Sequence, residues 1–158
     1  MKERVNHPQH YSHPSGVECI DIIRHHVCDI ANALKYLWRA GLKEEEGMTS
    51  KEKELEDLQK ALWYLHDYQE HFSYTYSMWP NSQTYHPSGV DSYTVTRYYS
   101  LSVALAIEDL WCVGIIVDSH ILVHPSEEQK VSNAIKNIEK RIDHVRQSLF
   151  SANAQSSS

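Results

Sequence analysis

Residues 51–71 constrain the fold more strongly than any other segment of the sequence. This stretch contains neither proline nor glycine, and its leucines recur at the spacing of a single helix face. The apolar stripe consists of Leu55, Leu58, Leu62 and Leu65. Thr49 or Ser50 is a suitable N-cap. We therefore predict one continuous helix over 51–71, and we expect Leu62→Ala to cost about 2 to 5 kcal/mol, as truncation of a core leucine does.

Two shorter helices are predicted before this one. Apolar residues in 18–26 lie on a helix-compatible face, and Asp29 is a candidate N-cap for a second helix that runs to about Ala40. Gly41 then ends this helix, because glycine readily adopts the conformation that follows a helix C-terminus. Residues 1–17 contain two prolines and a glycine, which predict a loop.

The C-terminal half has helical spacing as well. Residues 92–123 are rich in apolar side chains and we predict helix there, although the β-branched and aromatic residues of 93–99 are also compatible with a strand. Pro125 and the acidic residues that follow it open a last amphipathic helix. Its apolar stripe consists of Val131, Ile135, Ile138, Ile142, Val145 and Leu149.

These elements predict an all-α protein, a small helical bundle with a short N-terminal loop and a C-terminal two-helix extension. We divide the chain into a helical region at 1–72, a connector at 73–91, an extension at 92–150 and a disordered tail at 151–158. The extension is long enough to serve as a lid or as an oligomer interface. The many tyrosines and tryptophans favour a homo-oligomer.

Composition and charge argue against several classes of protein. The net charge of -6 does not favour binding to bulk nucleic acid. The apolar run at 101–117 is interrupted by Glu108 and Asp109, which argues against a membrane span. The N-terminus lacks the apolar core of a signal peptide, and three cysteines without paired spacing suit a reducing compartment. We therefore expect a cytoplasmic protein.

A five-residue sequence occurs twice in the chain. His-Pro-Ser-Gly-Val is found at 13–17 and again at 86–90, each time followed by an acidic residue and a predicted helix. The repetition suggests an internal duplication, and the alternatives are coincidence or a shared helix-entry turn. The charged patterns described next have no counterpart after Val90.

Four polar residues share one face of the second predicted helix, opposite its apolar stripe. They are Asn32, Lys35, Arg39 and Lys43. Three cations without an interleaved acid suit phosphate oxygens, whereas the alternative is an ordinary solvated basic face. If the face binds an anion, Arg39→Ala should leave folding nearly intact and weaken ligand binding by about 1.5 to 3 kcal/mol.

The long helix has a polar side that carries an unexpected tryptophan. Glu56, Lys60, Trp63 and Asp67 lie opposite the leucine stripe. An exposed indole at Trp63 is suited to stacking on a nucleobase. The alternative is that Trp63 and Tyr64 pack against another helix or a subunit.

Histidines and carboxylates near the N-terminus are candidate metal ligands. The loop supplies His7, His10 and Tyr11, and its imidazoles suit either zinc or hydrogen bonds to a base or phosphate. Two acidic pairs resemble those with which helical NTP pyrophosphohydrolases bind magnesium. The pairs are Glu18 with Asp21 and Glu54 with Asp57. Ion pairs of Glu56 and Asp57 with Lys60 are an alternative explanation for part of this pattern.

Four motifs occur in the order that one phage family shows. They are Asn-His-Pro-Gln-His-Tyr at 6–11, Gly-Val-Glu-Cys-Ile-Asp at 16–21, Asn-Ala-Leu-Lys-Tyr-Leu-Trp-Arg-Ala-Gly-Leu-Lys at 32–43, and Glu-Asp-Leu-Gln-Lys-Ala-Leu-Trp-Tyr-Leu at 56–65. Through them, residues 5–70 resemble the SaV-like family, long regarded as a domain of unknown function. The best-known activity in that family is an early phage nucleotide kinase that phosphorylates deoxynucleoside monophosphates without a P-loop. The chain departs from the family at Ala31, where glycine is usual.

The resemblance implies a phage-encoded nucleotide-binding protein of the host cytoplasm. As a kinase it would use a nucleoside triphosphate donor, with Mg²⁺ as a further cofactor. The catalytic candidates are Lys35, Arg39, Glu56 and Asp57. The candidate nucleotide contacts are Asn6, His7, His10, Tyr11, Asn32, Lys35, Arg39, Lys43, Lys60, Trp63 and Tyr64. The alternatives are a non-catalytic protein that sequesters a nucleotide and blocks host immune signalling, an NTP pyrophosphohydrolase-like enzyme, and a helical interaction module.

Overall fold

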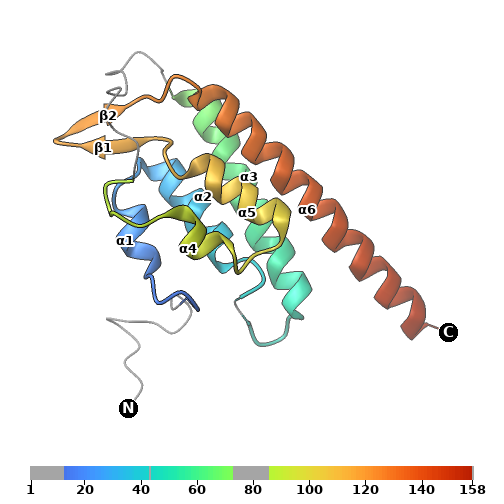
Figure 1. Cartoon of the computed structure of the whole chain (residues 1–158). Coiled ribbons are helices and arrows are strands. Elements are labelled where there is room, and N and C mark those ends of the chain that lie inside the picture. Colours follow the sequence, from blue (N-terminus) through green and yellow to red (C-terminus); the bar gives the residue numbers. More distant parts are fainter. Residues whose placement is uncertain (1–12, 43, 73–85, 158) are drawn as a thin grey trace.

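A computed structural model of the chain describes residues 13–42, 44–72 and 86–157. These residues form six helices and one short hairpin, so the predicted helical class is confirmed (Figure 1). The helices are α1 (Cys19–Ile23), α2 (Cys28–Arg39), α3 (Ser50–His71), α4 (Ser92–Thr96), α5 (Leu101–Leu110) and α6 (Glu127–Ser156). The strands are β1 (Ile115–Val117) and β2 (His120–Leu122).

Helix α3 confirms the predicted continuous helix and one of its two candidate caps. The Thr49 hydroxyl accepts a hydrogen bond from the Glu52 amide, and the Glu52 carboxylate accepts one from the Thr49 amide, which completes a capping box. Leu58 and Leu65 are fully buried, whereas Leu62 is only partly buried. The buried face is therefore rotated from the leucine stripe, because α3 packs against α2 on one side and α6 on another.

The N-terminus of α2 differs from the sequence prediction. Asp29 does not cap the helix but lies in its first turn, and the N-cap is Val27, which has no side-chain acceptor. The Val27 amide instead donates to the carbonyl oxygen of Gly114 at 2.8 Å, so a contact with a distant segment fixes this helix start. Gly41 follows the helix with a φ of 79°, as predicted.

The predicted helix over 92–123 is wrong in its second half. Helices α4 and α5 account for the first half, so the strand alternative at 93–99 is not adopted. After Gly114 the β-branched residues instead form the antiparallel pair β1 and β2. Asp118 and Ser119 between them both have positive φ, as the twist of a two-residue hairpin turn requires. His26 pairs with Ile115, which attaches the hairpin to the chain between α1 and α2.

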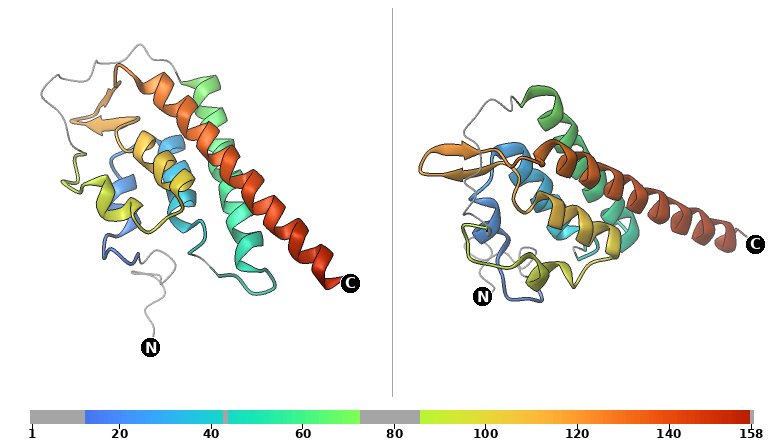
Figure 2. Two further views of the ribbon diagram at one scale, coloured as in Figure 1. Left: turned by 45° about the vertical axis from the view of Figure 1, so that its right-hand side comes forward. Right: turned by 45° about the horizontal axis from the view of Figure 1, so that its top comes forward.

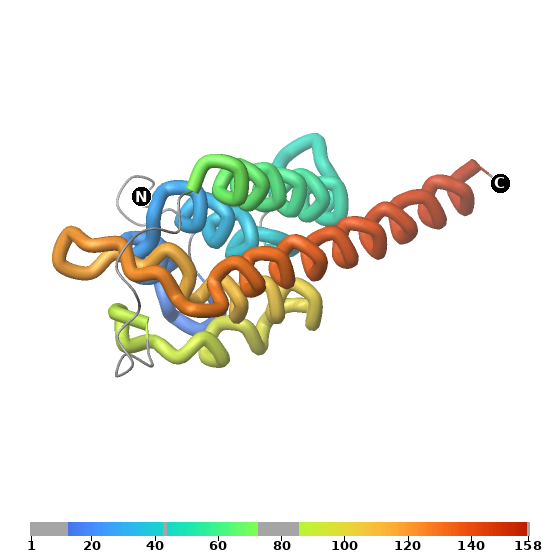
Figure 3. The backbone as a smooth tube through the Cα atoms, turned by 90° about the horizontal axis from the view of Figure 1, so that it is seen from above, coloured from blue at the N-terminus to red at the C-terminus, as the bar shows by residue number. Residues whose placement is uncertain are grey.

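The four longer helices enclose one core. Helices α3 and α6 lie side by side, with α2 packed on α3 and α5 packed on α6 (Figures 2 and 3). Helix α6 projects beyond the other helices and continues to Ser156, so most of the segment 151–158, for which we expected disorder, is helical. Cys19 is buried, Cys28 is exposed and Cys112 is partly exposed, all as free thiols. Within the described ranges, no helix combines the length and apolar character needed to span a bilayer.

Candidate functional site

Three cations surround the ring of Tyr36. The Lys35 Nζ lies 4.7 Å, the Arg39 Cζ 5.5 Å and the Lys60 Nζ 5.6 Å from the ring centroid. Lys35, Tyr36 and Arg39 are on α2 and Lys60 is on α3, so the packing of the two helices brings together cations that the sequence places on separate elements. We call Lys35, Tyr36, Arg39 and Lys60 the Tyr36 cluster. Tyr36 also stacks on Tyr64, with centroids 5.9 Å apart.

Arg39 is buried, which corrects the expectation that its face lies outside the core. Its side chain is only 10% exposed, and its Nη2 lies 3.8 Å from a carboxylate oxygen of Asp57. Within the described residues, the Arg39 Nε is buried and has no hydrogen-bond partner. The guanidinium thus keeps unused donors in a position where water is largely excluded.

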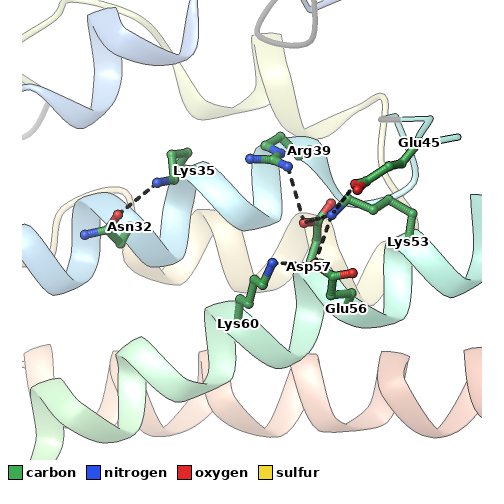
Figure 4. Close-up of polar contacts among 8 residues, drawn as sticks. All are labelled: Asn32, Lys35, Arg39, Glu45, Lys53, Glu56, Asp57 and Lys60. Carbon is green, nitrogen blue, oxygen red and sulfur yellow. Dashed lines mark hydrogen bonds and ion pairs between the residues drawn. The ribbon is translucent and has the colours of Figure 1, made fainter. Parts of the chain in front are cut away.

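An ion-pair network lies beside the cluster, next to Arg39 and Lys60 (Figure 4). The Lys53 Nζ is 3.0 Å from Glu45, 3.1 Å from Glu56 and 3.5 Å from the fully buried Asp57. Burial of Lys53 opposes its charge, but the hydrogen bonds to Glu45 and Glu56 and the nearby Asp57 raise its pKa overall. Sequence analysis missed Lys53 and Glu45. Lys53 could have been found from its position one helical turn before Asp57, which allows an ion pair between the two.

Glu56 bridges the buried network and the Tyr36 cluster. One of its carboxylate oxygens contacts both Lys53 and Lys60, which confirms the predicted ion pair of Glu56 with Lys60. The hydrogen bonds from Lys60 and Lys53 lower the pKa of Glu56 and keep it ionised. Asp57, by contrast, faces Arg39 and Lys53, and no ion pair joins it to Lys60 in the described part of the chain. That part of the expected pattern is therefore wrong.

Lys35 retains capacity to bind an anion. Its Nζ donates to the Asn32 side-chain oxygen at 3.0 Å, and Asn32 in turn donates to the Cys28 carbonyl oxygen. An ammonium group has three donors, and Asn32 is the one hydrogen-bond acceptor of Lys35 within the described ranges. Asn32 thus orients Lys35, and the remaining donors suit a phosphate oxygen.

Trp63 is exposed on α3, as the sequence suggested. Its residue exposure is 61%, and its ring contacts Tyr64 edge-on with centroids 5.0 Å apart. Trp63 and Tyr64 thus form an aromatic surface that continues from Tyr36. An exposed indole beside stacked tyrosines suits the apolar face of a base.

The metal-ligand candidates are engaged in other contacts. Asp21 pairs with Arg24 at 3.2 Å, and Glu54 lies 2.6 Å from Arg141 and 3.2 Å from Lys51. Glu18 precedes α1 as its N-cap residue. Across the described ranges, no group of three or more His, Cys, Asp and Glu side chains has the arrangement of a metal site.

Several predicted contact residues lie outside the described part of the chain. They are Asn6, His7, His10, Tyr11 and Lys43. The structure brings together the other members of the predicted set around α2 and α3, which are Asn32, Lys35, Arg39, Glu56, Asp57, Lys60, Trp63 and Tyr64.

The comparison with known families places the whole cluster in one matched region. Residues 5–66 match the model of a family described as a protein of unknown function (DUF3310). The match includes Tyr36, its three cations and the ion-pair network. No curated protein and no solved structure matches the chain. The chain therefore carries a DUF3310 domain at residues 5–66.

Proposed function

We propose that the protein binds a nucleotide and that the Tyr36 cluster holds its phosphate. The observation that carries this proposal is the buried guanidinium of Arg39, whose Nε has no partner within the described residues. A charged donor that is buried without a hydrogen-bond acceptor destabilises the fold by roughly several kcal/mol. An anionic ligand that accepts a hydrogen bond from this Nε removes the cost, and its charge adds to that of Asp57.

The residues of the cluster complement a nucleoside monophosphate. A guanidinium binds phosphate through two parallel hydrogen bonds, and Lys35 and Lys60 add charge from two helices. Trp63 and Tyr64 offer aromatic surface for the base. The resemblance to the SaV-like family favours the same class of ligand.

The activity proposed for the bound nucleotide is phosphoryl transfer from a nucleoside triphosphate. An oxygen of the deoxynucleoside monophosphate attacks the terminal phosphorus of the donor, and the bond to the donor's bridging oxygen breaks, which gives two diphosphates. Lys35 and Lys60 would neutralise charge on the transferred group. Because Asp57 is enclosed by Arg39 and Lys53, we assign it the positioning of Arg39 rather than contact with substrate. Glu56, which is partly exposed, is the carboxylate suited to hold Mg²⁺ or the acceptor.

A second candidate is sequestration of a nucleotide without turnover. It is favoured by the ion pairs of Glu56 and Asp57, since a carboxylate that holds lysine must release it before it can serve a metal or an acceptor. The pairing of Glu54 with Arg141 likewise disfavours a pyrophosphohydrolase, in which Glu54 and Asp57 would share one ion.

Calorimetric titration of Arg39 variants tests the binding site. Arg39→Ala should weaken binding of dTMP or dGMP by about 1.5 to 3 kcal/mol, and Arg39→Lys should recover only part of this loss. Because Arg39 faces Asp57, Arg39→Ala should also lower the melting temperature, contrary to the expectation from sequence. Lys136→Ala, which removes an exposed cation of α6, is the matched control and should change neither property.

Two further measurements complete the test. ATP and a cyclic dinucleotide are titrated in parallel, and diphosphate formation from ATP with dTMP or dGMP separates a kinase from a sequestering protein. If folded Arg39→Ala binds every nucleotide as the unaltered chain does, the Tyr36 cluster is a structural ion-pair network and the proposal fails.

A further inference from the structure

The two His-Pro-Ser-Gly-Val segments fold into the same turn. In each, the His Nδ1 lies 2.7 Å from the Ser hydroxyl, the Ser amide donates to that Nδ1 at 3.1 Å, and the Val amide donates to the Ser hydroxyl at 3.2 Å. The glycines both have positive φ, 79° at Gly16 and 74° at Gly89. The repeated sequence is thus a repeated turn, and the residues that follow it distinguish duplication from a shared helix-entry turn alone.

The correspondence continues far beyond the turn. His13 and His86 are 73 residues apart in the sequence. Adding the same 73 to the residue numbers of α1 gives both ends of α4, and adding it to the first residue of α2 gives the first residue of α5. Identical residues along this shift include Arg24 and Arg97, Ala33 and Ala106, Leu37 and Leu110, Trp38 and Trp111, and Gly41 and Gly114. Ala33, Leu37 and Trp38 and their three counterparts are all buried.

Helices α3 and α6 correspond as well, at a shift of 77. Their N-caps, Thr49 and Ser126, match at this shift. Six buried positions of α3 also match six of α6. They are Glu54, Asp57, Leu58, Ala61, Leu65 and Tyr68 in α3, and Val131, Ala134, Ile135, Ile138, Ile142 and Val145 in α6. We call α1 to α3 with the turn before them the first unit, and α4 to α6 with the turn before them the second unit. The β1 and β2 hairpin lies between α5 and α6, where the link is longer than that between α2 and α3, and it accounts for the change in shift from 73 to 77.

Contacts between the two units are reciprocal. His13 packs on Trp38 of its own unit and on Tyr98 and Tyr99 of the other. His86 packs on Trp111 of its own unit and on His25 and His26 of the other, which are the positions equivalent to Tyr98 and Tyr99. Exchange of contacts between equivalent positions is what a twofold axis generates. The packing of α3 on α6 and of α2 on α5 fits the same axis (Figure 3).

The three cations of the Tyr36 cluster and the buried Asp57 have no counterparts of the same charge in the second unit. At equivalent positions Glu108 replaces Lys35, Asp109 replaces Tyr36, Cys112 replaces Arg39, Ala134 replaces Asp57 and Asn137 replaces Lys60. The Glu108 carboxylate accepts hydrogen bonds from Ser92 at 3.2 Å and Thr96 at 3.1 Å, so in the second unit this position ties α5 to α4. The second unit thus lacks the cations of the Tyr36 cluster.

A cavity in the second unit indicates where the ligand of the first unit lies. It measures about 460 Å³, and its lining includes Gly89, Asp91, Ser92, Glu108, Trp111 and Cys112. The equivalent residues of the first unit are Gly16, Glu18, Cys19, Lys35, Trp38 and Arg39. Burial raises the pKa of the Cys19 thiol, at the position equivalent to Ser92, to about 12, and the charges of Lys35 and Arg39 oppose this rise.

The indole nitrogen of the shared tryptophan has a hydrogen-bond partner in the second unit and none among the described residues in the first. The Trp111 Nε1 donates to the Val90 carbonyl oxygen at 3.2 Å. The buried Nε1 of the equivalent Trp38 has no partner within the described residues, and neither has the Nε of Arg39. Because buried donors are normally hydrogen-bonded, these two donors at the C-terminal end of α2 indicate that a ligand with acceptor atoms binds beside them.

We infer that the chain is a tandem duplication of one helical unit, and that a nucleoside monophosphate binds in the first unit alone, at the counterpart of the second-unit cavity. The identity of the ligand rests on the proposed function. Lys35 and Arg39 hold the phosphate on the side that faces Cys19 and the His13 turn. The second unit covers α3 with α6, as a partner subunit would, and contributes no phosphate site.

Exchange of residues between equivalent positions tests this inference in the full chain. One variant carries Lys35→Glu, Arg39→Cys and Asp57→Ala, which the fold should accept because the second unit already has this set. The reciprocal variant carries Glu108→Lys, Cys112→Arg and Ala134→Asp. Calorimetric titration with dTMP and with dGMP should give one site per unaltered chain, no site in the first variant and two sites in the second.

Each alternative outcome has a distinct meaning. Two sites in the unaltered chain, or one site in the folded reciprocal variant, would overturn the inference and leave the proposed function intact. No binding of either monophosphate to the unaltered chain would overturn both. If Ala134→Asp prevents folding, Glu108→Lys with Cys112→Arg carries the same test, because both residues are at least partly exposed. The control is Lys136→Ala with Lys140→Ala, two exposed cations of α6.

Discussion

Buried histidines join the two units at the residue scale. The Nε2 atoms of His26 and His86 lie 2.9 Å apart, and the Nδ1 of His26 lies 2.7 Å from the Val113 carbonyl oxygen. Since the Ser88 amide donates to His86 Nδ1, His86 carries its proton on Nε2 and donates it to His26. This chain of hydrogen bonds requires both imidazoles to be neutral. Burial lowers the pKa of His26 to about 4 and that of His86 to about 3, where nearby His25 and His26 add to the effect.

Acid should therefore destabilise the fold before the carboxylates titrate. Histidine in the unfolded chain has a pKa of about 6.5, so the unfolded state binds protons that the folded state excludes as the pH falls from about 6.5 towards 4. Above this range protonation does not lower the free energy of unfolding. Between pH 7.5 and pH 5 the free energy of unfolding should fall by about 1 to 2 kcal/mol for each of the two histidines. Urea unfolding at these two pH values measures the loss.

The His86→Asn variant serves as the control for this pH dependence. It removes one depressed pKa and should reduce the difference between the two pH values. Equal stability of the unaltered chain at both pH values would show that the pair stays neutral in the unfolded state or is protonated in the folded one.

At the scale of the element, α3 shows how neighbours select a buried face. The leucine stripe identified the helix, but two packing partners bury a wider face that also includes Lys53, Glu54 and Asp57. Leu58 is fully buried on this face and Leu62 lies at its margin. The same helix thus supplies both the core and the carboxylates that hold the cations of the candidate site.

The position of each leucine on α3 should determine the cost of its truncation. Leu58→Ala should lower the free energy of unfolding by about 2 to 5 kcal/mol, since the side chain is surrounded by core atoms. Leu62→Ala should cost less, about 1 to 2 kcal/mol, because part of its side chain already contacts water, and this replaces the larger sequence-based value. Urea midpoints of the two variants provide the comparison, and a larger loss for Leu62→Ala would mean that α3 is rotated in solution.

At the scale of the whole molecule, the two units share one core. A single buried cluster includes residues of α2, α3, α5 and α6, and α3 contacts both its own unit and α6. Neither unit therefore has a separate interior, although each has its own turn, short helix and long helices. Such sharing couples the candidate site in the first unit to packing in the second.

The two units should consequently unfold together. Ile107→Ala in α5, the counterpart of Leu34 in α2, should lower stability by about 2 to 5 kcal/mol. Hydrogen exchange measured along a urea titration should show the amides of α2 and α5 losing protection at one common midpoint, which shifts equally for both in the variant. A shift confined to α5 would mean that the units unfold independently.

Local sequence determined the helices and the polarity of their faces. The spacing of Leu58 and Leu65, the cap at Thr49 and the stop at Gly41 act within a few residues, so they could be predicted without tertiary contacts. The pairing of Glu56 with Lys60 follows from the helical repeat alone.

Tertiary structure decided what depends on segments far apart in the chain. From the sequence Arg39 was predicted to be a surface cation, but the packing of α3 on α2 buries it against Asp57. The β-branched residues after Gly114 were predicted to be helical, but they form a hairpin that pairs with His26 through Ile115. The duplication shows the same limit, because Lys35 and Glu108 have opposite charges at equivalent positions of one scaffold. Packing preserves shape and burial, which many sequences satisfy, whereas charge at a partly exposed position is free to change. That the two units share one fold could therefore be recognised only from the contacts in the tertiary structure.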